Sequence, residues 1–355
     1  MRKYIALLIL VSFCLPTQTW AADLNGASCK KAGQTKKLLG KEYKCVKQGK
    51  KKTWRELYVP NKQPYSSVPK EVAEVYVQLD NQISKIAGQL SATVPAEVKL
   101  ISEVPSNERN KPNQEASDKS LQVLRFFKNT MPAYEFYTYQ SVGWINSKME
   151  SICPQQAKQT KADRNVGASV GCGKLVISNL NGWNNTVGPT SASWFEAGHE
   201  AFHLAQYHWA LKPNNSNDSN WYWGATDWYR EGGASVFGAF VGSMMSNLKS
   251  TYGDAIAFEG SPYKYNECKR AWDSWQISNE PGGKDFYNNC EYGMGRRMMD
   301  LLVAKHGGIS AVLNLYEEVG RGAEFETAFK KAHGLTLKEF FTEAEAYLDA
   351  SGWKK

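Results

Sequence analysis

The segment that decides the fold runs from Trp194 to Leu211 and reads WFEAGHEAFHLAQYHWAL. It contains no proline and only one glycine, so we expect a helix. His199 and His203 lie four residues apart, and on a helix both imidazoles then project from one face, one turn apart. This spacing lets two imidazole nitrogens bind one zinc ion. The alternative is a helix that carries two unrelated histidines.

Glu200 directly follows the first histidine of this pair. In this pattern the carboxylate accepts a proton from a water molecule at the metal and does not bind the metal itself. His208 is a weak ligand candidate, because a five-residue step on a helix turns its side chain by about 140° from the face of His199 and His203. The segment therefore predicts a metal site in which Glu200 is the general base.

A third protein ligand is expected in the stretch TDWYREGGAS, residues 226–235. A polar residue at its start would cap a second helix. Four small residues follow Glu231, and they would let this helix approach the first closely enough for the carboxylate to reach the metal. The alternative is a solvated Glu231 beside Arg230.

The composition describes a globular chain whose positive charge is unevenly placed. Apolar residues make up 42% and charged residues 22% of the 355 residues, which excludes wholesale disorder. A mean hydropathy of −0.51 excludes a protein that crosses the membrane several times. The net charge of +8 originates in residues 24–55, where ten lysines and one arginine face one glutamate. We expect no nucleic-acid partner, because such binding would depend on this short segment alone.

The beginning of the chain has the pattern of an export signal. Arg2 and Lys3 precede an apolar stretch, and the small residues Thr19 and Ala21 suit cleavage after Ala21. The apolar stretch is too short for a spanning helix. We therefore expect residues 1–21 to be removed and the mature protein to be extracytoplasmic, in a periplasm or outside the cell, without a transmembrane anchor. The alternative is an uncleaved anchor.

The cysteines agree with export. The chain has seven, and the six that follow Cys14 fall into three local pairs, which an oxidising compartment would join. Other connectivities remain allowed by the sequence. The expected disulfides are Cys29–Cys45, Cys153–Cys172 and Cys268–Cys290.

The mature chain is expected to divide near residue 60. Residues 22–60 form a basic module and linker, in which turns separate short strand-like pieces and a cysteine pair replaces a large core. The module resembles a small cysteine-pair, lysine-rich module of secreted bacterial proteins. Residues 24–55 would bind an anionic cell-envelope surface or act only as a solubilising appendage.

Residues 61–355 alternate helical and strand patterns before long helices dominate from residue 193 onward. This order predicts an α+β fold, with a small mixed sheet followed by a mostly helical half. The expected elements are helices at 70–90, 121–129 and 142–149, strands at 97–103, 134–139 and 173–180, and a polar loop at 105–118.

Taken together, the motifs resemble a gluzincin metallopeptidase of the peptidase MA-like kind. The motifs that carry the resemblance are His199-Glu200-x-x-His203 with Gln206, then Trp228-x-x-Glu231-Gly232-x-Ala234, and later Tyr292-x-x-Gly295. The resemblance implies a zincin-like catalytic half, with zinc held by His199, His203 and Glu231 and with catalysis by Glu200. Related enzymes carry an oxyanion-stabilising tyrosine or histidine after the glutamate ligand, at a spacing comparable to that between Glu231 and Tyr292. The alternative is that Tyr292 is a core tyrosine.

One position departs from the pattern of several gluzincins. An acidic residue one turn after the glutamate ligand orients the first histidine in those enzymes, whereas this chain has Ser235. The partner of His199 must then come from elsewhere, or the site is weaker.

Two classes of function follow. The first is a secreted zinc-dependent peptidase that acts on a peptide or protein substrate. The second is a non-catalytic surface-binding or adhesion protein built on a degenerate zincin scaffold. A zinc hydrolase that cleaves another bond is a third reading. The presence of Glu200 together with both histidines favours the peptidase, because a degenerate relative would be free to lose the base.

Overall fold

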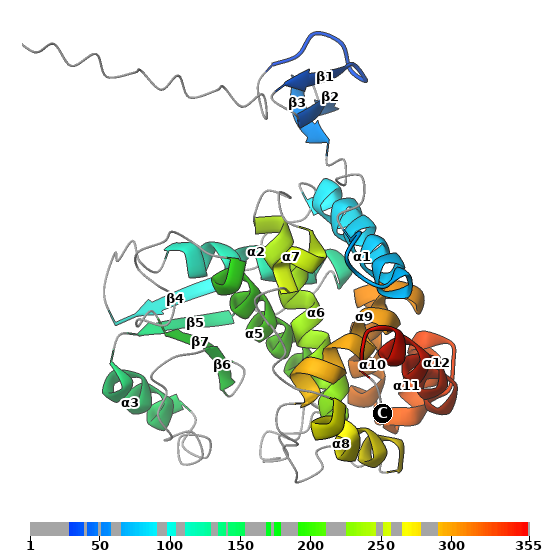
Figure 1. The fold of residues 1–355 in the computed structure, drawn as a ribbon. Helices are drawn as coiled ribbons and strands as arrows, with labels where there is room; N and C mark the ends of the chain where they lie inside the picture. The colour runs from blue at the N-terminus through cyan, green and yellow to red at the C-terminus, as the bar shows by residue number, and fades with distance from the viewer. Residues whose placement is uncertain are drawn as a thin grey trace, which may run out of the picture. The chain divides into compact units, whose positions relative to one another are not determined.

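The computed structural model forms two units by its internal contacts, Met1–Val59 and Pro60–Lys355 (Figure 1). The signal segment predicted at residues 1–21 and the pair Cys153–Cys172 lie outside the described residues. The structure describes residues 28–38, 41–48, 51–57, 65–90, 98–103, 111–128, 134–139, 141–152, 168–171, 174–178, 191–210, 225–245, 251–256, 265–277 and 290–353.

The first unit contains an antiparallel three-stranded sheet of β1 (Thr35–Leu38), β2 (Lys41–Gln48) and β3 (Lys51–Leu57). Along β2 the side chains alternate, so that Tyr43 and Cys45 are buried while the lysine between them is exposed. They pack with Trp54 of β3 into a small core. The disulfide Cys29–Cys45, with 5.9 Å between its Cα atoms, staples this core and confirms the first predicted pair.

The second unit begins with helix α1 (Lys70–Gln89) and a four-stranded mixed sheet. The order of the sheet is β4-β5-β7-β6; its first three strands are parallel, and β6 pairs antiparallel with β7. The helix α3 (Val142–Ile152) packs Ile145 and Met149 against Tyr137 and Tyr139 of β5. The strands are β4 (Val98–Ser102), β5 (Tyr134–Tyr139), β6 (Ala168–Gly171) and β7 (Lys174–Ser178).

Helix α2 (Lys111–Phe127) corrects the prediction of a polar loop at 105–118 and of a helix that starts at Leu121. The helix begins at Lys111, and Pro112 occupies its first turn, where a missing N–H costs no intrahelical hydrogen bond. Leu121 and Leu124, in its last turns, are buried, whereas Asp118 is exposed. Because the early turns are polar, the sequence pattern there was typical of a loop. Strand β6, only four residues long, was not predicted.

Helices α5 (Ser191–Ala210) and α6 (Asp227–Met245) form the centre of the helical half. Every residue of α6 from Trp228 to Met244 is buried, so this helix is enclosed on all sides. Figure 1 shows α6 between α5 on one side and α9 and α10 on the other. The surrounding elements are α7 (Tyr252–Ile256), α8 (Tyr265–Ile277), the π-helical turn η4 (Glu291–Gly295), α9 (Arg296–Lys305), α10 (Gly308–Gly320), α11 (Phe325–His333) and α12 (Leu337–Ala350).

Glycines on both helices bring α5 and α6 into close contact. A Cβ atom on Gly238 would lie 2.6 Å from the Phe195 carbonyl oxygen, and one on Gly198 would lie 3.0 Å from the Cα of Gly238. The prediction had assigned this approach to residues 232–235. A Cβ on Gly232 would instead meet the carbonyl oxygen of Gly295 in η4, again at 2.6 Å. Small residues along α6 thus admit α5 on one side and η4 on another.

The layout confirms the coarse prediction of an α+β fold. The disulfide Cys268–Cys290 joins α8 to the residue before η4 and confirms a second predicted pair. None of the helices in the described ranges combines the length and the hydrophobicity that a membrane crossing needs.

Candidate metal centre

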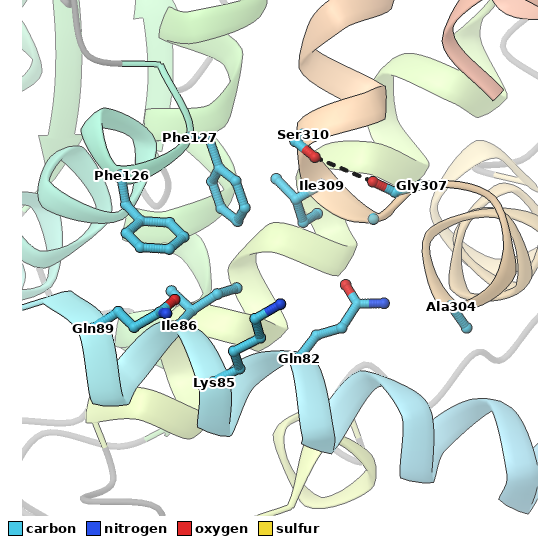
Figure 2. A pocket seen from close by; sticks show the side chains of 11 residues that line it. Gln82, Lys85, Ile86, Gln89, Phe126, Phe127, Ala304, Gly307, Ile309 and Ser310 are labelled. Carbon is cyan, nitrogen blue, oxygen red and sulfur yellow. Dashed lines mark hydrogen bonds between the residues drawn. The ribbon is translucent and has the colours of Figure 1, made fainter.

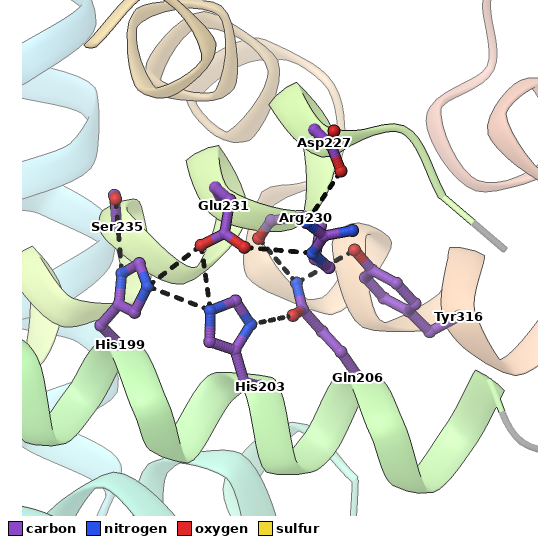
Figure 3. A network of polar contacts seen from close by, with 8 residues as sticks. All are labelled: His199, His203, Gln206, Asp227, Arg230, Glu231, Ser235 and Tyr316. Carbon is purple, nitrogen blue, oxygen red and sulfur yellow. Dashed lines mark hydrogen bonds and ion pairs between the residues drawn. The ribbon is translucent and has the colours of Figure 1, made fainter. Parts of the chain in front are cut away.

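Two buried imidazoles of α5 and one carboxylate of α6 converge at the crossing of these helices (Figure 3). The Nε2 atoms of His199 and His203 lie 3.0 Å apart. Oε2 of Glu231 lies 3.3 Å from Nε2 of His199 and 3.1 Å from Nε2 of His203. Glu231 is therefore no solvated surface residue, and the structure brings together all three residues that the sequence singled out as ligands.

Glu200 lies beside this cluster. Ligand atoms of His199, Glu200 and His203 all lie within 4.8 Å of one another, and this group could hold a metal ion. Glu200 is partly exposed, whereas both histidines are buried. The site therefore combines two buried imidazoles with the partly exposed carboxylate of Glu200.

Gln206 fixes the orientation of His203. Its side chain is fully buried one turn further along α5, with Oε1 2.6 Å from Nδ1 of His203. Its amide nitrogen donates hydrogen bonds to the Arg230 carbonyl oxygen at 2.9 Å and to the Tyr316 hydroxyl at 3.0 Å. A carbonyl oxygen only accepts, so the amide nitrogen must face Arg230 and the amide oxygen must face His203.

Ser235 is the neighbour of the other imidazole. Its hydroxyl oxygen lies 3.4 Å from Nδ1 of His199, a long and weak contact. The sequence predicted that the partner of His199 comes from elsewhere or that the site is weaker, because Ser235 is not acidic. The structure places Ser235 itself beside Nδ1 of His199, as a neutral and weak partner.

Arg230 holds the far side of the Glu231 carboxylate. Its Nε lies 3.1 Å from Oε1 of Glu231, and its Nη2 lies 2.8 Å from Oδ1 of Asp227. Burial alone would raise the pKa of Glu231, but His203, His199 and Arg230 hold it well below its ordinary value. The carboxylate is thus charged, with Oε1 engaged by Arg230 and Oε2 directed at the imidazoles.

Glu196 is a neighbour that the sequence reading missed. It lies one turn before Glu200 on α5, and burial together with the charge of Glu200 raises its pKa to about 8. At neutral pH this carboxyl keeps its proton. The i,i+4 spacing of the two glutamates was the available signal.

Tyr292 lies over the site from η4. Its ring centroid is 5.9 Å from that of His199, with 31° between the ring planes. The negative charge of Glu231 and burial hold the pKa of Tyr292 well above its ordinary value, so the hydroxyl keeps its proton and can donate a hydrogen bond. The neighbouring Glu291 is buried, and burial followed by the charges of Glu231 and Asp227 raises its pKa to about 7.

His208 stands apart from this group. Its side chain is exposed near the end of α5 and its ring packs beside Trp209, in keeping with the helical rotation that made it a weak candidate. Arg230 and Tyr316 were not predicted as parts of the site. Tyr316 belongs to α10, and no local motif joins it to Gln206, which lies 110 residues earlier in the chain.

A separate cavity of about 620 Å³ lies between α1, α2 and the turn before α10 (Figure 2). The side chains of Lys85 and Gln82 rise from α1 toward that turn, and Phe126 and Phe127 of α2 form another wall. Among the described residues, its lining shares none with the His–Glu cluster.

Comparisons of the chain with protein-family models, with curated proteins and with solved structures find no match.

Proposed function

We propose that the protein is a secreted zinc-dependent peptidase of the gluzincin kind, with a zincin-like helical half. The observation that carries the proposal is the convergence of His199, His203 and Glu231, whose facing atoms are separated by 3.0, 3.1 and 3.3 Å. Tetrahedral zinc with bonds of about 2.0–2.1 Å separates its ligand atoms by about 3.3 Å. Two imidazoles and one carboxylate are also a donor set of catalytic zinc sites, which keep a fourth position open.

The surroundings of the three ligands support the same assignment. Buried nitrogen and oxygen acceptors that face one another without a cation repel, and a divalent cation removes that repulsion. Gln206 and Arg230 hold His203 and Glu231 with their ligand atoms directed at a common point. Hydrogen bonds of this kind orient metal ligands in proteins.

A bound zinc ion would polarise the substrate carbonyl and make the attacking water more acidic. Glu200 accepts a proton from that water as it attacks the peptide carbon, and passes the proton to the leaving amine when the C–N bond breaks. Its partial exposure suits this role, since it lies beside the two histidines and also reaches solvent. Tyr292, whose phenol keeps its proton, donates a hydrogen bond to the carbonyl oxygen as negative charge develops there.

The experiment is elemental analysis of the purified mature protein, paired with cleavage of a broad peptide library. About one zinc per chain and cleavage that stops with a chelator and returns with zinc are expected. A protein that binds zinc but cleaves no peptide would favour a hydrolase of another bond or the degenerate scaffold. A protein without bound metal would exclude the proposed chemistry.

A second function is proposed for the N-terminal module, namely adhesion to an anionic cell-envelope surface. The observation that favours it is the exposure of lysines on the small sheet, which are Lys36, Lys44, Lys47, Lys51 and Lys52. Deletion of residues 22–56 should reduce salt-sensitive binding to anionic wall or membrane material and leave peptide cleavage unchanged. If the protein binds equally well with and without the module, the module acts only as a solubilising appendage.

A further inference from the structure

The Gln206 side chain is a buried hydrogen-bonded link between the two ligand-bearing helices. It accepts from His203 on its own helix, α5, and donates to the Arg230 carbonyl on α6, directly before Glu231. Its second donor reaches the Tyr316 hydroxyl on α10. All three partners are buried, so water does not compete for these bonds.

These contacts dictate which nitrogen of His203 carries the proton. The Gln206 amide cannot rotate by 180°, because its NH₂ group would then face the imidazole while its oxygen faced the Arg230 carbonyl oxygen. With the amide oxygen 2.6 Å from Nδ1, the shorter of the contacts at the two ring nitrogens, Gln206 favours the neutral imidazole that carries its proton on Nδ1. The lone pair is then on Nε2, the nitrogen that lies 3.1 Å from Oε2 of Glu231.

We propose that Gln206 is a positioning residue that sets the Nδ1-protonated tautomer of His203 and joins it to the backbone that carries Glu231. The inference rests on the proposed metal site, and it names a residue that acts through a ligand. Tyr316 completes the arrangement, because its hydroxyl accepts the second amide hydrogen, while the Arg230 carbonyl oxygen, which only accepts, keeps the amide from turning. The two imidazoles are therefore held unequally, since Ser235 contacts His199 only at 3.4 Å.

The first test reads the tautomer directly, in metal-free protein with ¹⁵N-labelled histidine at alkaline pH, where imidazoles are neutral. Long-range ¹H–¹⁵N correlation spectra distinguish a protonated Nδ1 from a protonated Nε2. In wild type, His203 should carry its proton on Nδ1, and His203→Gln assigns its signals. A wild-type His203 protonated on Nε2 would overturn the proposal without any variant of Gln206.

The second test uses variants and zinc affinity measured by competition with a chromophoric chelator. Gln206→Leu should populate both tautomers of His203 and weaken zinc binding by about 10–100-fold. Gln206→Glu retains an acceptor for Nδ1–H, so it should keep the wild-type tautomer and lose less affinity than Gln206→Leu. If Gln206→Leu does not fold, the spectrum of Gln206→Glu still decides, because a shift to the Nε2-protonated form contradicts the proposal.

Gln82→Leu is the matched control. Gln82 also donates its amide to a helix carbonyl, that of Val303 at 2.9 Å, but it belongs to α1 and contacts neither imidazole. It should leave the tautomer and the zinc affinity unchanged. If Gln82→Leu loses as much zinc affinity as Gln206→Leu, the loss reflects a general effect on stability. Because neither readout uses cleavage, a protein that binds zinc and cleaves nothing would refute the peptidase and leave this inference standing.

Discussion

Oε2 of Glu231 lies 3.1 Å from Nε2 of His203, although 28 residues separate the two along the chain. The contact depends on α6 lying directly against α5, and Gly238 permits this because any side chain there would meet the Phe195 carbonyl oxygen. A backbone contact between two helices thus sets the distance between two side chains that have the chemistry of metal ligands.

The ligand set predicts how zinc content responds to substitution. His203→Ala and Glu231→Ala should each reduce zinc from about one per chain to near none, because two protein ligands hold zinc poorly. His208→Ala, which removes an exposed imidazole of the same helix, should retain full zinc. Elemental analysis after exhaustive dialysis measures this. Full zinc in Glu231→Ala would mean that Glu200 or another group is the third ligand.

The glycine contact predicts opposite effects for two identical substitutions. Gly238→Ala should lower the free energy of unfolding by about 1–3 kcal/mol, because its Cβ would lie 2.6 Å from a backbone oxygen. Gly88→Ala, on the exposed face of α1 with nothing within 4 Å, should raise it by about 0.4–1 kcal/mol.

Urea unfolding of both glycine variants beside wild type supplies the measurement. A Gly238→Ala variant as stable as wild type, with the same zinc affinity, would show that the helices tolerate separation and that the glycine does not set the ligand distance.

The disulfide Cys268–Cys290 predicts a coupled loss of stability and activity. The bridge closes a span of 22 residues, for which loop-closure entropy gives about 3 kcal/mol. Cys290 directly precedes η4, which carries Tyr292 over His199. The double variant Cys268→Ala/Cys290→Ala should therefore unfold at lower urea concentration and cleave more slowly, while it keeps zinc on α5 and α6. A variant that loses zinc but keeps the wild-type stability would contradict the prediction that the disulfide supports stability and cleavage but not zinc binding.

His333 predicts how stability responds to acid. Its Nδ1–H donates to the His306 carbonyl oxygen at 2.8 Å, and its Nε2 lies 2.7 Å from the Tyr229 hydroxyl. Burial lowers the pKa of His333 from 6.5 to about 4. The unfolded chain therefore binds a proton at a higher pH than the folded one, and the free energy of unfolding should fall by about 3 kcal/mol as the pH falls from 6.5 to about 4.

Comparison of wild type with His333→Gln across this pH range isolates the effect of His333. The variant is expected to be less stable at neutral pH, and its deficit should shrink as the pH falls. If the free energies of unfolding of wild type and His333→Gln change with pH in parallel, the protonation of His333 is not a source of the acid sensitivity.

Local patterns predicted the parts of the site that lie close together in sequence. The i,i+4 histidines and the small residues after Glu231 indicated two helices in contact, and both helices are present. Local pairing also predicted two disulfides that the structure contains. By contrast, Tyr316 reaches Gln206 only because α10 packs against α5, and a chain pattern carries no signal for such a contact.

The start of α2 was missed for a related reason. Its first turns are polar, and a solvent-facing helical turn has the composition of a loop. The predicted approach of α5 at residues 232–235 is only partly correct: a Cβ on Gly233 would lie 3.3 Å from Phe202 of α5, whereas Gly232 faces η4 and the closer approach to α5 is at Gly238. Which face of a buried helix meets which neighbour depends on the tertiary packing around it.

The most direct test of the proposed peptidase compares wild type with Glu200→Gln for zinc content and peptide cleavage. The substitution preserves the size of the side chain and removes the carboxylate that accepts the proton from water. Zinc should stay near one per chain in both proteins, whereas cleavage should fall by about 10²–10⁴-fold in the variant. Cleavage by Glu200→Gln at the wild-type rate would contradict the proposed peptidase.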